Sequence, residues 1–221
     1  MPRTISTTPY PDHAVDPATD CALCPRLVAY RAANRDQHPG WHNAPAPPFG
    51  DLNARLLVVG LAPGLMGANR TGRVFTGDAA GRLLFETLLK TGFASGDFRD
   101  DGRDSLRLHD CLVTNAVLCA PPGNRPLPVE EATCRPHLRA LIDAMHRLEV
   151  IVTLGEVARK NTLKALGFPL LAVPAGHGSW AQLGRHRLVN SYHCSRLNVN
   201  TGRLTPAMFE AIFRDVYSPS Q

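Results

Sequence analysis

The sequence predicts an α/β protein of three layers, α/β/α, in which helices cover both faces of a central four-stranded parallel sheet. Three observations lead to this fold class. Four short apolar runs alternate along the chain with segments of helical pattern. The runs are continuously apolar, as expected for strands that are buried on both faces. The unusual loops all follow the expected strands, which is where ligands bind in such folds.

The expected elements alternate from residue 55 onward. Strands are predicted at 55–61, 109–118, 149–155 and 185–192, and helices at 79–91, 128–148, 156–166 and 204–217. The second helix opens with Pro128 and acidic residues in its first turn, which favours a helix start there. Residues 1–18 are predicted to form a Pro-rich, poorly ordered arm, and residues 19–221 are predicted to form one domain.

Composition restricts the class of protein. A chain of 221 residues that is 44% apolar and 19% charged can bury a sizeable core and is typical of a soluble globular protein. No apolar run approaches the roughly 18 residues of a membrane span, and the first residues lack the apolar segment of a secretory signal. We therefore expect a cytoplasmic protein without membrane association. The formal net charge of +5 fits a polyanionic partner such as nucleic acid.

A long glycine-rich loop, "GLAPGLMGANRTGRVFTGD" (60–78), separates the first strand from the first helix. It matches neither the phosphate-binding pattern G-x-x-x-x-G-K-[ST] nor the dinucleotide fingerprint G-x-G-x-x-G. We interpret it as a loop whose backbone approaches a flat or phosphorylated ligand, because glycine permits such an approach. Phe75 would offer a stacking face and Asp78 a carboxylate. The alternative is that Phe75 is a core residue and Asp78 only a helix N-cap.

Four of the six cysteines form two pairs. Cys21 and Cys24 are spaced C-x2-C, and Cys119 and Cys134 are spaced C-x14-C. Four thiolates in two pairs can hold zinc or a [4Fe–4S] cluster, and disulfides are disfavoured in a reducing cytoplasm. Zinc sites more often use two C-x2-C pairs. The spacing therefore favours iron–sulfur, with zinc as the alternative.

Three segments resemble the signature motifs of family 5 (UDGb-type) uracil-DNA glycosylases: "GLAPGLMGANRTGRVFTGD", "TNAVLCAPPGNRPL" and "YHCSRLNVNTGRLT". The four paired cysteines match the [4Fe–4S] ligand pattern that families 4 and 5 share. The resemblance runs from about Cys21 to Phe213. It implies a monomeric DNA repair enzyme that flips out uracil and hydrolyses its N-glycosidic bond in double- or single-stranded DNA. It also implies activity on other deaminated bases such as hypoxanthine and xanthine.

The resemblance assigns roles to residues of the three motifs. Ala62 stands where family 1 enzymes carry a water-activating Asp, so Asp78, the nearest carboxylate of the motif, is the implied catalytic replacement. His193, the second implied catalytic residue, would hydrogen-bond the base oxygen on which negative charge develops. The implied base-binding set is Gly60, Ala62, Gly64, Phe75, Asn115 and His193. The implied DNA-binding set is Ser195, Arg196, Leu197 and Asn198, with Leu197 as an apolar wedge.

The resemblance also implies how the base pocket is built. Phe75 would stack on the flipped base, and Asn115 would offer both a donor and an acceptor to a pyrimidine edge; the alternative for Asn115 is a plain turn residue. Gly64 stands where family 1 enzymes carry a bulky Tyr, so we expect a wider pocket. Two positions depart from the family pattern. Met66 stands where a His is common, and Cys194 replaces the Pro of the usual His-Pro-Ser.

Two other classes of function remain open at this level. One is a non-catalytic iron–sulfur or zinc module that holds nucleic acid, and the other is a nucleotide or phosphate hydrolase on the same fold. Cleavage of an oligonucleotide that carries one uracil separates the three.

Overall fold

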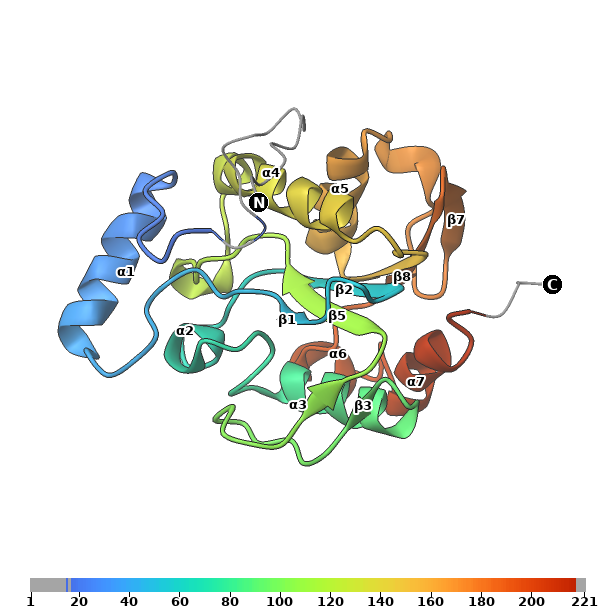
Figure 1. Ribbon diagram of the computed structural model, residues 1–221, viewed down its shortest axis with the longest axis horizontal. Coiled ribbons are helices and arrows are strands. Elements are labelled where there is room, and N and C mark those ends of the chain that lie inside the picture. Colours follow the sequence, from blue (N-terminus) through green and yellow to red (C-terminus); the bar gives the residue numbers. More distant parts are fainter. Residues whose placement is uncertain (1–14, 16, 218–221) are drawn as a thin grey trace, which may run out of the picture.

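The computed structural model describes residue 15 and residues 17–217 (Figure 1), so most of the predicted arm at 1–18 lies outside the described residues. Its centre is a six-stranded sheet of order β1-β5-β2-β6-β8-β7. The strands are β1 Phe49–Gly50, β2 Leu56–Gly60, β5 Cys111–Asn115, β6 Val150–Leu154, β7 Trp180–Leu183 and β8 His186–Ser191. A separate two-stranded sheet pairs β3 (Ala94–Ser95) with β4 (Arg107–Leu108).

The four inner strands β5, β2, β6 and β8 run parallel to one another, and they are the four strands that the sequence predicts. Every residue of β2, β5 and β6 is buried, which explains their continuous apolar runs. The edge strands β1 and β7 pair antiparallel and widen the predicted sheet by one strand on each side. Both are short and partly exposed, so they leave no apolar run in the sequence.

The long helices also lie where the sequence predicts them: α3 (Ala79–Lys90), α4 (Pro128–Ala144), α5 (Glu156–Leu166) and α7 (Pro206–Arg214). Helix α4 ends earlier than predicted because the fully buried Met145 caps it and turns the chain toward β6. Three helices were not predicted: α1 (Pro25–Gln37), α2 (Ala68–Thr71) and α6 (Arg196–Asn200). None of the described helices is long and apolar enough to cross a membrane.

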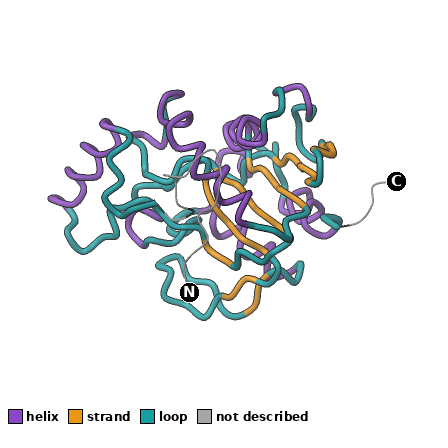
Figure 2. The backbone as a smooth tube through the Cα atoms, turned by 45° about the horizontal axis from the view of Figure 1, so that its top comes forward, coloured by secondary structure: helices purple, strands orange, loops and turns teal. Residues whose placement is uncertain are grey.

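The helices form one layer on each face of the sheet (Figures 1 and 2). Alternate residues of β2 point to opposite faces, as a pleated strand requires. Leu56 and Val58 pack with the buried side chains of α3 and α7, while Leu57 and Val59 pack with those of α4 and α5. The predicted three-layer α/β/α fold is confirmed. The carboxyl ends of the four parallel strands consequently open onto one edge of the sheet, where the motif loops gather.

Candidate active site and cysteine cavity

The first pair of parallel strands brings Gly60, Phe75 and Asn115 into contact. Gly60 ends β2 and lies opposite Asn115, which ends β5. A Cβ on Gly60 would lie 2.4 Å from Cζ of Phe75 and 2.5 Å from Oδ1 of Asn115. The ring of Phe75 and the amide of Asn115 therefore both pack against the backbone of Gly60, and only glycine fits at position 60. The stacking side chain and the polar edge that the sequence predicts lie next to each other.

Phe75 occupies an unusual backbone conformation. Its φ is 57°, in the left-handed region that a bulky residue rarely adopts. Such conformations persist where the surrounding structure holds them, and they occur often at functional sites. The next residue, Thr76, is buried, and its hydroxyl donates to the carbonyl of Arg73 at 2.7 Å. The chain around the ring is therefore fixed by its own loop.

Asp78 caps a helix, as one of the two alternatives predicts, and its second oxygen leaves the other alternative open. It is the N-cap of α3, where its Oδ1 accepts a hydrogen bond of 2.8 Å from the backbone N–H of Gly81. The residue is nevertheless exposed. Its second oxygen faces Gly64, where a Cβ would lie 3.7 Å from Oδ2. One oxygen caps the helix and the other remains available at the surface of the cleft.

His193 follows β8 and is held from two sides. The side-chain amide of Asn198 donates to the carbonyl of His193 at 2.8 Å. A Cβ on Gly155, whose φ is 90°, would lie 3.1 Å from Cβ of His193, so the loop after β6 has to approach the histidine without a side chain. Burial lowers the pKa of His193, and the nearby charge of Asp78 opposes that shift. The imidazole is therefore neutral at neutral pH.

One cleft joins most of the predicted site residues. Its walls come from the loop after β2, the start of α3, residue 124 and the loop after β8. Predicted residues in its lining are Ala62, Gly64, Asp78, His193, Ser195 and Arg196. The contact of Gly60, Phe75 and Asn115 is not part of this lining and adjoins it through Leu61. A second cleft lies on the other side of His193, between the loops after β6 and β8.

The predicted DNA-binding residues form the helix α6 and its cap. Leu197 is 71% exposed and Arg196 is exposed, so both project from the surface. The hydroxyl of Ser195 caps the helix by accepting from the backbone N–H of Asn198 at 3.4 Å. The amide of Asn198 turns inward to His193. Arg196 and Leu197 are therefore open to solvent, whereas Ser195 and Asn198 form hydrogen bonds within the loop and its helix.

The two departures from the family pattern have different structural outcomes. Cys194 is fully buried, and its Sγ lies 3.5 Å from the carbonyl oxygen of Ala80 in the first turn of α3. Burial against α3 thus anchors the loop that lacks the usual proline. Met66 is 58% exposed and does not line the cleft beside Asp78.

Sequence reasoning missed three residues at this site: Asn124 in the cleft wall, Gly155 behind His193, and the inward role of Asn198. Asn124 lies within the motif "TNAVLCAPPGNRPL", which is a signal that could have identified it. The sequence predicts Gly155 only as the last residue of the strand 149–155. The inward turn of Asn198 depends on the helix α6, which the motif does not reveal.

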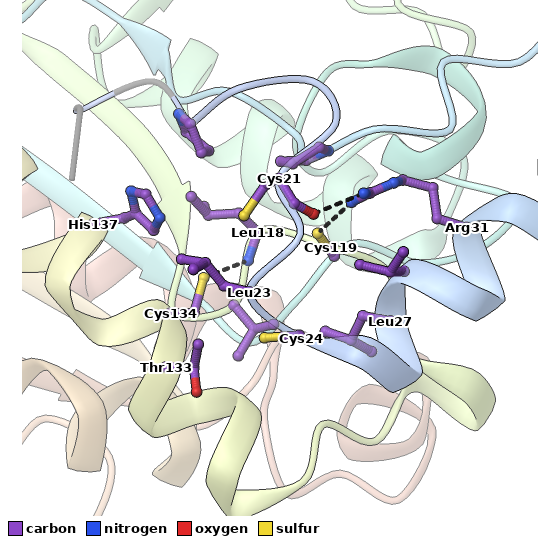
Figure 3. Close-up of a pocket in the computed structure, with 14 residues that line it drawn as sticks. Cys21, Leu23, Cys24, Leu27, Arg31, Leu118, Cys119, Thr133, Cys134 and His137 are labelled. Atoms are coloured by element: carbon purple, nitrogen blue, oxygen red, sulfur yellow. Dashed lines mark hydrogen bonds between the residues drawn. The ribbon is translucent and has the colours of Figure 1, made fainter. Parts of the chain in front are cut away.

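The four paired cysteines line a single cavity, which Figure 3 shows with their sulfur atoms around a common space. Cys21 and Cys24 come from the segment before α1, Cys119 follows β5, and Cys134 lies in α4. Apolar side chains, including Leu27, complete most of the lining. Among the described residues, no three His, Cys, Asp or Glu side chains are grouped closely enough to hold a metal ion.

Burial dominates the electrostatics of this cavity. It raises the pKa of Cys119 to about 11 and that of Cys134 to about 12, and it also raises the pKa of Cys24. Two donors nevertheless point at sulfur. The backbone N–H of Leu118 lies 3.4 Å from Sγ of Cys134, and the guanidinium of Arg31 lies 3.5 Å from Sγ of Cys119. Such donors suit thiolates that bind a metal.

Comparisons with known proteins identify the family of this chain. Residues 47–217 match the model of the uracil DNA glycosylase superfamily. The chain belongs to that superfamily. A type-5 uracil-DNA glycosylase from Pyrobaculum aerophilum is 42% identical over 207 residues, which cover 92% of this chain and 90% of that protein. A type-5 enzyme from Thermus thermophilus is 44% identical over 203 residues, 88% of this chain and 91% of that protein.

Type-4 uracil-DNA glycosylases are more distantly similar to this chain. A type-4 enzyme from Thermotoga maritima is 33% identical over 149 residues, which cover 67% of this chain and 68% of that protein. The prediction that the chain resembles the type-5 enzymes is confirmed, and so is the class of enzyme, a DNA N-glycosylase. The superfamily match begins at residue 47, after α1 and after Cys21 and Cys24.

Proposed function

We propose that this uracil-DNA glycosylase flips uracil out of DNA and hydrolyses its N-glycosidic bond. One observation carries the proposal: Asp78 and His193 line the same cleft at the carboxyl edge of the sheet, beside the contact of Phe75 with Gly60 and Asn115. A reactive carboxylate and a hydrogen-bond donor thus adjoin a place for a flat base. The names of the type-5 relatives support uracil as the substrate.

Recognition of the base falls to Phe75 and Asn115. A flipped base loses its stacking partners in the duplex, and an aromatic ring replaces them. The Asn115 side chain offers a carbonyl oxygen and an NH₂ group, so it can pair with an acceptor and a donor on a pyrimidine edge. Because Asn115 is buried, a base that cannot form these hydrogen bonds would leave its amide unpaired at a cost of about 1–3 kcal/mol.

The reaction separates charge between sugar and base. As the bond between C1′ and the base nitrogen breaks, the sugar becomes positive and the base negative. A water oxygen then bonds to C1′, and the proton that the water releases neutralises the departing base. The exposed oxygen of Asp78 faces the cleft, where it would stabilise the sugar cation and orient that water. Neutral His193 would donate an N–H to the base oxygen that gains negative charge. Both interactions strengthen in the transition state.

We extend the substrate range to other deaminated bases, including hypoxanthine and xanthine. The support is the room at Gly64: a Cβ there would meet its neighbours only at 3.7 Å and beyond, which is ordinary contact distance. Gly64 itself adds no side chain to this wall of the cleft. Gly64→Tyr should therefore retain uracil excision better than hypoxanthine excision, measured on oligonucleotides that differ only in the damaged base. Equal loss on both bases would contradict the wider pocket.

The activity is tested with an oligonucleotide that carries one uracil, followed by alkaline cleavage of the abasic product. Asn115→Ala and Phe75→Ala should weaken excision more than they weaken binding to undamaged duplex, because affinity for duplex comes mostly from phosphate contacts. Equal loss of excision and binding would indicate a folding defect. Absence of cleavage by the wild-type protein on every deaminated base would favour a non-catalytic nucleic-acid-binding module.

We also propose that Cys21, Cys24, Cys119 and Cys134 hold a [4Fe–4S] cluster. Four soft sulfur donors in an apolar cavity fit such a group, and so does the amide of Leu118 on a sulfur. Zinc, the alternative, would use the same four sulfurs at about 2.3 Å from one ion, and metal analysis separates the two. When bound, the cluster supplies a cross-link between three distant segments of the chain.

Metal analysis of the purified protein tests the cluster. We expect a brown protein with iron and sulfide and with no stoichiometric zinc. Cys134→Ala should lose most of the iron and become less soluble, whereas Cys111→Ala, a buried cysteine in β5 outside the cavity, should retain it. Stoichiometric zinc without iron or sulfide would overturn the assignment.

We propose a monomer as the active form. One chain supplies every candidate group of the cleft, and flipping one nucleotide requires a single cleft. Light scattering at working concentration, with and without DNA, measures the mass directly. A dimer in both states would contradict the proposal.

A further inference from the structure

Helix α1 lies at the periphery of the molecule, away from the central sheet (Figure 1). Its buried residues are Leu27, Arg31 and Asn34, which follow one another at intervals of four and three and so share one face of the helix. Only one of the three is apolar. A helix whose buried face is mostly polar cannot be attached mainly by the hydrophobic effect, so α1 needs another anchor.

Arg31 is a buried cation without a carboxylate partner. The residue is 5% exposed, and among the described residues it forms no ion pair. One guanidinium nitrogen donates to Sγ of Cys119 at 3.5 Å, and another donates to the carbonyl of Cys21 at 2.7 Å. Its Nε is buried and has no hydrogen-bond partner. Because burial of a charge is costly unless the charge is paired, this arginine requires an anion close by.

We propose that Arg31 is the counter-cation of the cluster, and that this charge pair fastens helix α1 to the rest of the protein. The inference rests on the proposed cluster, whose four thiolates give it a net negative charge. Arg31 lines the cysteine cavity and already points at one sulfur (Figure 3). The cluster thereby satisfies the guanidinium, and the guanidinium offsets the charge of the cluster in an apolar cavity.

The pair couples cluster retention to the position of α1. With the cluster in place, Arg31 connects α1 to residues 21 and 119, which belong to separate segments of the chain. Without the cluster, the same side chain is an unpaired charge in an apolar cavity. Movement of α1 toward solvent, which would hydrate the guanidinium, then becomes favourable. Loss of the cluster is therefore expected to release α1 while the sheet and its layers stay folded.

Arg26 provides a matched control on the same helix. Its Nε and a terminal nitrogen donate to the two carboxylate oxygens of Glu130 in α4, both at 2.7 Å. This pair also connects α1 to the rest of the protein, but Arg26 does not line the cysteine cavity. Replacing Arg26 thus removes an arginine and an anchor of α1 without removing the charge beside the sulfurs.

The first measurement is the half-life of the visible absorbance of the holoprotein in the presence of an iron chelator. Arg31→Met should lose the cluster at least about tenfold faster than wild type, the lower end expected for loss of a charge-assisted hydrogen bond. Arg31→Lys should be intermediate, because it keeps the charge and loses the fork of donors. Arg26→Met should stay within about twofold of wild type. An Arg31→Met half-life equal to that of wild type would overturn the inference.

The second measurement is hydrogen exchange of the backbone amides of residues 25–37 in each holoprotein and after cluster removal. Exchange in α1 should rise in Arg31→Met and in the cluster-free wild type, with strands β2 and β5 still protected. Unchanged protection of α1 after cluster removal would overturn the coupling. The outcomes distinguish the two proposals. Wild-type protein that holds zinc without iron rejects both the cluster and the role of Arg31. Wild-type protein that holds iron, together with an Arg31→Met variant of normal half-life, rejects only the role of Arg31.

Discussion

The carboxylate of Asp78 in the cleft and the thiols of the cysteine cavity differ in their exposure to solvent. In the cleft, Asp78 is exposed and uses one oxygen to cap α3, so the other is free to act. In the cavity, Cys119 and Cys134 have pKa values raised to about 11 and about 12 by burial, and Arg31 is buried among them. Groups of the first kind are available for a reaction. Groups of the second kind need a bound partner and therefore affect stability.

The two regions also differ in how the fold assembles them. The cleft consists of loops at the carboxyl ends of parallel strands, so the order of the strands in the sheet is enough to bring these loops together. The cavity joins the segment before α1, the residues after β5 and one turn of α4. Nothing in the sheet forces the first of these segments to meet the other two. Substitutions in the cleft should therefore change the rate, and substitutions in the cavity should change retention of the cluster and the fold around it.

The sharpest test of this contrast is Asp78→Asn. Loss of a charge that stabilises the transition state should slow uracil excision on the order of 10²–10³-fold. Stability should change little, because Asn caps a helix about as well as Asp. The measurements are the single-turnover rate, the affinity for duplex and the free energy of unfolding by urea.

Asp51→Asn is the control for this change, because Asp51 also accepts a backbone hydrogen bond, from Asn53 at 2.9 Å, but lies in an exposed loop before β2. Its rate should stay within about threefold of wild type. If Asp78→Asn excises uracil as fast as this control, Asp78 is only a helix cap. The catalytic role would then pass to His193 and to the backbone amides of 60–64.

A second test adds one methyl group at Gly60, where Phe75 and Asn115 come together. In Gly60→Ala the new Cβ would overlap the ring of Phe75 and the amide of Asn115, at 2.4 and 2.5 Å. One of them has to move, and a displacement of about 1 Å in a site can cost roughly 10² in rate. Gly40→Ala, where nothing lies within 4 Å, is the matched control and should keep its rate. Equal rates in the two variants would show that the contact is not needed.

A third test concerns the loop of His193. Asn198→Ala removes the hydrogen-bond donor to the backbone carbonyl of His193 but does not change the imidazole side chain itself. A hydrogen bond of this kind is worth about 0.5–1.5 kcal/mol, so excision should slow by up to roughly tenfold, with duplex affinity nearly unchanged. Asn200→Ala, an exposed residue of the same short helix, controls for helix propensity. A fall in duplex affinity as large as the fall in rate would favour direct binding of DNA by Asn198.

Most of the fold could be predicted because buried parallel strands leave a plain signal. The strands β2, β5 and β6 are mostly apolar and wholly buried, β8 is mostly buried, and the helices between them are long. The edge strands β1 and β7 gave no such signal, because they are short and one side of each faces solvent. Helix α1 was missed for a related reason: its buried face carries Arg31 and Asn34, so no apolar stripe marks it.

The proximity of two candidate side chains could be predicted from the motifs, whereas their roles stay predictions. Asp78 and His193 met in one cleft as the motifs implied. The sequence could not show that Gly155 leaves space for His193, since that contact joins the ends of two strands far apart in the chain. Nor could it show that Arg31 lies beside Cys119, because 88 residues separate them. Their proposed roles depend on tertiary packing, which carries no local pattern.

The smallest expected effect is the dependence of stability on pH through His193, a partly buried titratable side chain and one of the two proposed to react. Burial lowers its pKa in the folded protein, so the unfolded chain, with a pKa of about 6.5 at this residue, binds the proton more readily. Its stabilising contribution is therefore fully present above about pH 6.5 and is lost as the pH falls through the lower folded pKa.

Urea unfolding at several pH values from about 7.5 down to about 5 should show a smaller loss of stability in His193→Gln than in wild type. His146→Gln, at an exposed position, should follow the wild type. A His193→Gln variant that loses as much stability as wild type over this range would show that the histidine is hydrated in the folded protein, and the cleft would then contain no buried titratable group.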